Sequence, residues 1–201
     1  MYKLKTLFIA IALLISTVSH AQTIRSITTD IFTVTYSEVY QQPLEVSYKV
    51  LCPTGDASRK GMTFKGVDDI LTSDNADYSD NPYDKGHMAP AASFNCDKET
   101  LKKTFSYLNC ALQHQGLNRG PWKELERFER NLAKVFTDVS VVIVIHFDNE
   151  NSWLDTGAMV PSGFTKVINI KDNNKIIDTF TFVFPNKNVA GRDWNEFRIY
   201  N

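Results

Sequence analysis

The chain has 201 residues, of which 43% are hydrophobic and 22% are charged, and its formal net charge is −1. This size and composition are typical of one soluble globular domain, and no repeat or low-complexity tract appears. The near-neutral charge excludes a protein coated with positive charge, so any site for a polyanion must be a local patch.

The first 21 residues have the pattern of a secretory signal peptide. Lys3 and Lys5 precede an apolar run over residues 7–15, and Ser19-His20-Ala21 supplies small residues for cleavage. The run is too short to span a bilayer, which disfavours the alternative of an uncleaved membrane anchor. We therefore expect residues 22–201 to form a single domain with no membrane contact, secreted or periplasmic, with 20 basic and 23 acidic residues.

The N-terminal half of this domain predicts strands followed by an irregular region. Apolar and polar residues alternate over 31–36 and 44–50, which predicts two strands. Residues 53–82 are rich in Gly, Asp, Ser and Asn and indicate a loop with short strands. The three cysteines, Cys52, Cys96 and Cys110, allow one disulfide in an oxidising compartment, and the sequence leaves open which two pair.

Two helices are expected in the middle of the chain. Asp97 can cap a helix over 98–107. Pro121 suits the first position of a longer helix that runs to about residue 136. The apolar residues at three- and four-residue steps form the expected buried stripe of this helix: Leu125, Phe128, Leu132 and Val135.

The C-terminal third predicts three more strands. Residues 139–147 are almost all apolar or β-branched, which favours a central strand covered on both faces. Residues 166–170 and 176–184 form a predicted hairpin around Asp172-Asn173-Asn174. The expected fold class is α+β, a mostly antiparallel sheet flanked by helices.

The residues that could take part in catalysis or metal binding lie in two segments. Asp84-Lys85-Gly86-His87 is followed 31 positions later by Asn118-Arg119-Gly120-Pro121-Trp122, which opens the longer helix carrying Glu126 and Arg130. Hydrolysis of a phosphodiester needs a base for the attacking water and positive charge for the phosphate. A histidine suits the first task, and a magnesium ion with basic side chains suits the second. The amide oxygen of Asn118 is an acceptable ligand for magnesium.

Each of these residues alone also has an ordinary structural interpretation. His87 can be a loop histidine, Asn118 a helix cap, and the four-residue spacing of Glu126 and Arg130 a surface ion pair. The surrounding charge favours the functional interpretation, because residues 98–134 hold eight basic and four acidic residues in an acidic chain. His114, His146 and Trp122 are expected to be structural.

In combination these motifs resemble the DNA/RNA non-specific endonuclease family, whose active site is a ββα-metal (His-Me finger) motif. The family signature Asp-Arg-Gly-His and the small, proline-containing run after it correspond to residues 84–92. The Asn-x-Gly-x-Trp motif corresponds to residues 118–122, and the Glu-x-x-x-Arg helix to Glu126 and Arg130. Weaker similarity extends over about residues 30–185.

The resemblance implies a role for each matching residue. His87 would be the general base, Asn118 the single direct protein ligand of magnesium (with manganese as an alternative ion), and Glu126 the carboxylate that holds metal-bound waters. The implied phosphate-binding residues are Arg59, Lys85, Arg119 and Arg130, and the implied supporting residues are Asp84, Asn109 and Gln113.

Three departures from the family pattern stand out. Lys85 replaces the usual arginine and cannot form the bidentate hydrogen bonds of a planar guanidinium. Leu112 replaces a proline before Gln113, and His146-Phe147 replaces Gly-Pro.

The expected function is an exported magnesium-dependent endonuclease acting on DNA and RNA with little sequence preference. The alternatives are a nucleic-acid-binding module with impaired catalysis and an envelope interaction protein that binds no nucleic acid. Nucleic-acid preference, product ends and oligomeric state stay open.

Overall fold

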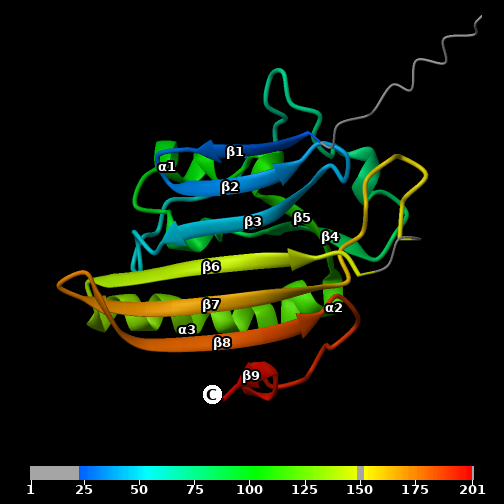
Figure 1. The fold of residues 1–201 in the computed structure, drawn as a ribbon. Coiled ribbons are helices and arrows are strands. Elements are labelled where there is room, and N and C mark those ends of the chain that lie inside the picture. Colours follow the sequence, from blue (N-terminus) through cyan, green and yellow to red (C-terminus); the bar gives the residue numbers. More distant parts are fainter. Residues whose placement is uncertain (1–22, 149–151, 201) are drawn as a thin grey trace, which may run out of the picture.

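The computed structural model describes residues 23–148 and 152–200 and has two antiparallel sheets (Figure 1). The predicted leader, residues 1–21, lies outside the described residues. The large sheet has the strand order β1-β2-β3-β6-β7-β8-β9, and the small sheet pairs β4 with β5. The α+β class expected from the sequence is confirmed.

Neighbouring strands of the large sheet are all antiparallel. They are β1 (Ile24–Thr28), β2 (Phe32–Ser37), β3 (Gln42–Lys49), β6 (Asp138–His146), β7 (Gly163–Asp172), β8 (Lys175–Pro185) and β9 (Arg198–Ile199). The small sheet consists of β4 (Tyr83–His87) and β5 (Cys110–His114).

The helices are α1 (Lys98–Lys103), α2 (Gln115–Leu117) and α3 (Lys123–Val135). A π-type turn, Asn118–Trp122, joins α2 to α3, and short 3-10 turns occupy Ala76–Tyr78, Ala91–Ser93, Tyr107–Asn109 and Trp194–Phe197. No helix of the described residues is both long enough and apolar enough to cross a membrane.

Helix α3 lies against one face of the large sheet, behind β6, β7 and β8 in Figure 1. Its Phe128 ring packs 5.5 Å from the ring of Phe180 on β8. The prediction that both faces of residues 139–147 are covered is wrong, because burial alternates along β6 between buried and partly exposed residues. A strand covered on one face only can have the same apolar composition as a strand covered on both faces, if valines also stand on its exposed face.

Both predicted helices differ from the structure at their ends. The helix predicted over 98–107 ends at Lys103, where the last turn is closed by tighter backbone bonds: Thr104 N donates to Leu101 O and Phe105 N to Lys102 O, both at 3.1 Å. On α3, Val135 is 76% exposed and does not belong to the buried stripe. The stripe instead includes Glu129, which is fully buried.

The start of the longer helix follows the expectation for Pro121. Helical backbone already appears in α2, but Gly120 interrupts it with φ −103° and ψ −120°. Pro121 restarts the helix at a position where its missing N–H has no carbonyl to reach. The side chain of Trp122 is fully buried, with its ring 5.5 Å from those of Phe164 and Phe184, so it is a core residue as expected.

The predicted β7–β8 hairpin is confirmed, with a two-residue turn at Asn173 and Asn174. Both residues have positive φ, 47° and 64°, which asparagine tolerates and a tight hairpin turn requires. Residues 53–82 hold isolated bridges and the 3-10 turn Ala76–Tyr78 in place of the expected short strands. Cys52 pairs with Cys96, and Cys110 is free and buried.

Candidate active site

The two predicted segments meet in one cleft of about 1110 Å³. β4 ends at His87, β5 runs back beside it, and the chain then enters the helical region with Asn118 one turn before α3. This is a ββα arrangement, with the histidine on a strand and the asparagine at the helix, as expected. Eight of the predicted site residues line the cleft: Arg59, Asp84, Lys85, His87, Asn118, Arg119, Glu126 and Arg130.

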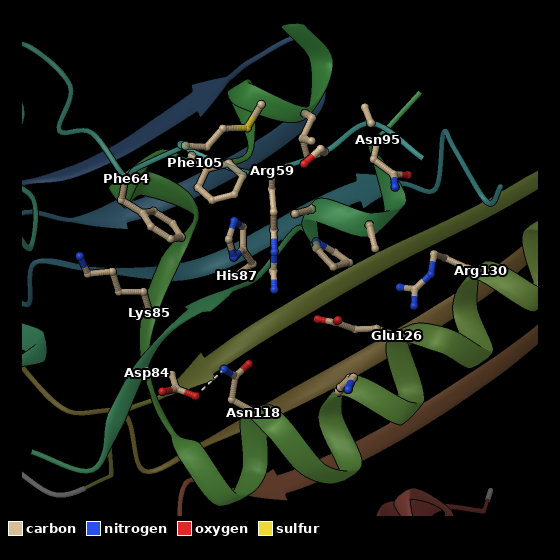
Figure 2. A pocket seen from close by; sticks show the side chains of 18 of the residues that line it. Arg59, Phe64, Asp84, Lys85, His87, Asn95, Phe105, Asn118, Glu126 and Arg130 are labelled. Atoms are coloured by element: carbon tan, nitrogen blue, oxygen red, sulfur yellow. Dashed lines mark hydrogen bonds between the residues drawn. The ribbon is translucent and has the colours of Figure 1, made fainter. Parts of the chain in front are cut away.

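His87 lies at the centre of the cleft, with Arg59 beside it (Figure 2). The rings of Phe64 and Phe105 flank its imidazole at 4.6 and 4.8 Å between ring centroids. Burial and the nearby Arg59 guanidinium lower the pKa of His87 to about 3. Its Nε2 is buried without a hydrogen-bond partner in the described parts of the chain. The imidazole is therefore neutral at physiological pH and has a nitrogen free to take up a proton.

The two remaining predicted residues support the strand of His87 from behind the cleft. The buried side-chain amide of Asn109 accepts from Ala89 N at 2.7 Å and donates to Ala89 O at 2.9 Å, which fixes the backbone just after the histidine. Gln113 packs against Gly86, where a β-carbon would lie 2.5 Å from the Gln113 side-chain oxygen. A glycine before the histidine is therefore required by close packing.

Asp84 orients the asparagine that is expected to bind metal. Asn118 Nδ2 donates to Asp84 Oδ2 at 2.8 Å, and Arg119 binds both carboxylate oxygens of Asp84 at 2.8 and 2.5 Å. Burial opposes ionisation of Asp84, but the hydrogen bonds from Arg119 and Asn118 lower its pKa overall. Since the nitrogen of Asn118 is engaged, its amide oxygen is the atom left for another ligand, and Figure 2 shows it turned away from Asp84.

Glu126 and Arg130 project from α3 into the cleft (Figure 2). No ion pair among the described residues joins them, so the interpretation as a surface ion pair is wrong. Burial raises the pKa of Glu126 to about 7, against the opposing charge of Lys166. Arg130 Nη1 is buried and has no hydrogen-bond partner in the described chain, so it is a donor available to an anion.

A fully buried ion pair lies beneath this part of α3, and the sequence reasoning missed it. Lys166 Nζ donates to Glu129 Oε1 at 2.7 Å, and the Tyr48 hydroxyl donates to Glu129 Oε2 at 2.7 Å. The same ammonium lies 3.9 Å from the centre of the Trp122 ring. The available signals were a lysine at an inward position of an alternating strand and a glutamate on the apolar stripe of α3.

Lys85 lines the cleft but directs its ammonium away from the centre (Figure 2). Its Nζ bonds the side-chain oxygen of Asn75 and lies 5.5 to 6.0 Å from the ring centres of Tyr107, Tyr78 and Phe64. Arg59 is exposed and keeps its guanidinium near His87. Of these two predicted phosphate-binding residues, Arg59 has the geometry for that role in this conformation.

The leucine that replaces the family's proline has a structural reason. Leu112 N donates to Gln42 Oε1 at 2.9 Å, a bond that proline cannot make. His146, at the other departure, has Nε2 2.7 Å from Thr165 Oγ1 on the neighbouring strand and does not line the cleft. Both departures therefore affect the scaffold and leave the cleft residues in place.

The donors in the cleft suit a hard cation bound largely through water. No group of three or more His, Cys, Asp or Glu that could hold a metal ion is found in residues 23–148 and 152–200. The oxygens that line the cleft include the oriented amide oxygen of Asn118 and the carboxylate of Glu126. Oxygen donors of this kind suit hard divalent cations, whereas structural zinc sites use Cys and His.

Comparison with known proteins identifies the family of this chain. The family model described as DNA/RNA non-specific endonuclease matches residues 14–200. The chain belongs to this family. Relatives include human mitochondrial endonuclease G, 28% identical over 67% of this chain, and mouse mitochondrial nuclease EXOG, 30% identical over 72%. Nuclease C1 of Cunninghamella echinulata var. echinulata is 32% identical over 68% of this chain.

The fold of this family member also matches a solved nuclease structure. The crystal structure of an EndoG/EndoGI complex gives a TM-score of 0.75 and covers 87% of this chain and 80% of that one, at 24% identity. The chain spans 50%, 44% and 60% of the lengths of endonuclease G, EXOG and nuclease C1. The relatives thus carry sequence beyond the region shared with this protein.

Proposed function

We propose that this protein is an exported endonuclease that hydrolyses phosphodiester bonds of DNA and RNA with support from magnesium, or manganese as an alternative ion. The observation that carries the proposal is that three groups converge on one cleft: the His87 imidazole, the Asn118 amide oxygen, and an Arg130 nitrogen with no hydrogen-bond partner in residues 23–148 and 152–200. These are a base, a metal ligand and an anion-binding group, the three components that phosphodiester hydrolysis needs.

His87 would take the proton from the attacking water. The neutral imidazole can accept a proton, but a pKa of about 3 makes it a weak base in the free protein. Burial is the larger cause of this low pKa and the Arg59 charge the smaller one, and a phosphodiester bound beside Arg59 would offset only the latter. Neutralising the Arg59 charge would raise the pKa of His87, while burial would continue to hold it below the usual value.

Asn118 would hold the metal ion directly, and Glu126 would hold its waters. A bound magnesium ion would supply positive charge next to the phosphate oxygens and the leaving group. Asp84 keeps the Asn118 oxygen towards the cleft, and the Lys166–Glu129 pair supports the segment of α3 that carries Glu126.

The basic side chains of the cleft would bind the substrate by its phosphates. Arg59 and Arg130 face the cleft near His87 and Glu126 (Figure 2), and Arg119 and Lys123 extend the positive surface along the helix start. Contacts made mainly to phosphate carry no base sequence, which explains weak sequence preference and predicts strong salt dependence. The disulfide Cys52–Cys96 agrees with export to an oxidising compartment.

The test is digestion of plasmid DNA and of a matched RNA by residues 22–201, with magnesium, with manganese and with EDTA. We expect cleavage of both substrates with the metal ions and none with EDTA. His87→Ala should abolish turnover and keep affinity for DNA, whereas the control His146→Ala, outside the cleft, should cut as the wild type does. Equal cleavage by wild type and His87→Ala would remove the proposed base.

The placement of Lys85 favours one competing function, a module that binds nucleic acid without cutting it. Its ammonium is held among aromatic rings instead of facing the cleft centre. Plasmid that stays intact with both metal ions between pH 6 and 9, while gel-shift binding persists, would establish the module.

A further inference from the structure

The loop that carries Arg59 is attached to the rest of the protein at both ends and is free in the middle. At its far end, Lys65 N donates to Phe105 O at 3.1 Å and Tyr107 N donates to Lys65 O at 2.9 Å. Within residues 58–63, the hydrogen bonds made to other described residues are local, Lys60 N to Ser58 Oγ and Met62 N to Arg59 O. The position of Arg59 therefore depends on how the two ends are held.

The near end is held by a compact set of contacts to residues 93–96, which follow the His87 strand. Cys52 forms the disulfide with Cys96, and its N–H donates to Ser93 O at 2.9 Å. Ala57 N donates to Asn95 O at 2.9 Å, and Asn95 Nδ2 donates to Gly55 O at 2.8 Å. We call this set the Cys52–Asn95 brace.

The brace is closely packed as well as bonded. A β-carbon at Gly55 would lie 2.4 Å from the carbonyl oxygen of Asn95, so the two backbones touch and only glycine fits there. The last bond of the brace is at Ala57, two residues before Arg59. A small change in the brace is therefore transmitted directly to the guanidinium beside His87.

We propose that the Cys52–Cys96 disulfide and Asn95 are positioning groups that hold Arg59 over the cleft, so that the enzyme reaches full activity only after this disulfide has formed. The inference rests on the proposed nuclease function. When the disulfide forms, each thiol loses one proton and one electron, and a disulfide donor such as oxidised glutathione takes them up and becomes two thiols. In a reducing compartment the folded chain would keep His87 and Asn118 in place and lack a fixed Arg59.

The first experiment measures magnesium-dependent plasmid cleavage well below the unfolding temperature. Cys52→Ser/Cys96→Ser and Asn95→Ala, which keeps the disulfide, should each lose about 10-fold to 100-fold in kcat, because misplacing a charge-binding group by about 1 Å costs this much. Cys110→Ser, which removes the buried free cysteine outside the brace, is the matched control and should stay within about twofold of wild type.

A double variant distinguishes a role in positioning Arg59 from a general loss of stability, because the two predict different combined losses of kcat. In an Arg59→Ala background, breaking the brace should cause no further loss of kcat, since the group it positions is already absent. Brace variants that cut within twofold of wild type would overturn the proposal. The proposal would also be overturned if a brace variant lowered kcat by the same factor in the Arg59→Ala background as in wild type.

A second experiment does not depend on nuclease activity. Trypsin should cut after Arg59 or Lys60 at least tenfold faster in wild type treated with dithiothreitol, and in the brace variants, than in the oxidised wild type. Cleavage after Lys102 and Lys103 should keep its rate. If wild type cuts no nucleic acid, the nuclease function fails while the trypsin rates still decide whether the brace fixes the loop; unchanged rates would overturn it.

Discussion

Replacing Glu126 by glutamine should stabilise the metal-free protein at alkaline pH while removing cleavage activity. Burial raises the pKa of this carboxyl from 4.5 to about 7, so the folded state favours the neutral acid. The stabilisation is fully present below pH 4.5, where the folded and unfolded forms are both protonated. It is lost as the pH rises through 7, because the folded state must then hold the ion. The free energy of unfolding should therefore fall by about 2 to 3 kcal/mol between pH 5 and pH 8. This follows from roughly 1.4 kcal/mol per unit of difference between the folded and unfolded pKa.

Glutamine is neutral at every pH and therefore has no such cost. The free energy of unfolding, measured by urea titration in EDTA, should be similar for wild type and Glu126→Gln at pH 5 and should favour the variant by about 2 kcal/mol at pH 8. Glu124→Gln is the control, because Glu124 lies on the same helix, is partly exposed and pairs with Arg127. A difference between wild type and Glu126→Gln that is the same at both pH values would refute the reasoning.

Three further changes have clear expectations. Lys166→Met leaves a buried glutamate unpaired and should cost about 3 to 5 kcal/mol, seen as a lower midpoint in thermal or urea unfolding. Asp84→Ala removes the acceptor that holds the Asn118 amide and should weaken magnesium affinity about 10-fold to 100-fold, measured from the dependence of cleavage on magnesium concentration. Leu112→Pro restores the residue common in the family and should destabilise by roughly 1 to 3 kcal/mol in the same unfolding assay, because the buried Gln42 oxygen loses its donor.

The sequence predicted the elements whose signals are local. The β7–β8 hairpin was predicted from alternation around an asparagine-rich turn, and the helix restart at Pro121 from the chemistry of the missing N–H. The joint spacing of His87, Asn118 and Glu126 predicted that these residues share a cleft, and they do.

What the sequence missed depends on pairing between distant segments. The burial of β6 on one face only, the choice of Cys96 as the partner of Cys52, and the Lys166–Glu129 pair are all set by tertiary packing. Tertiary packing also turns the Lys85 ammonium away from the centre of the cleft, because Asn75 and the aromatic rings that contact it come from other parts of the chain. No local pattern reports such contacts.

The strand order of the large sheet follows the order of the chain, and β3 pairs directly with β6. A single segment, residues 50–137, connects these two paired strands. It contains every predicted site residue from Arg59 to Arg130. The scaffold and the chemistry therefore occupy separate stretches of the sequence. Loops within this segment can change length or charge, and so change the shape and charge of the cleft, while the seven-stranded sheet is left unaltered.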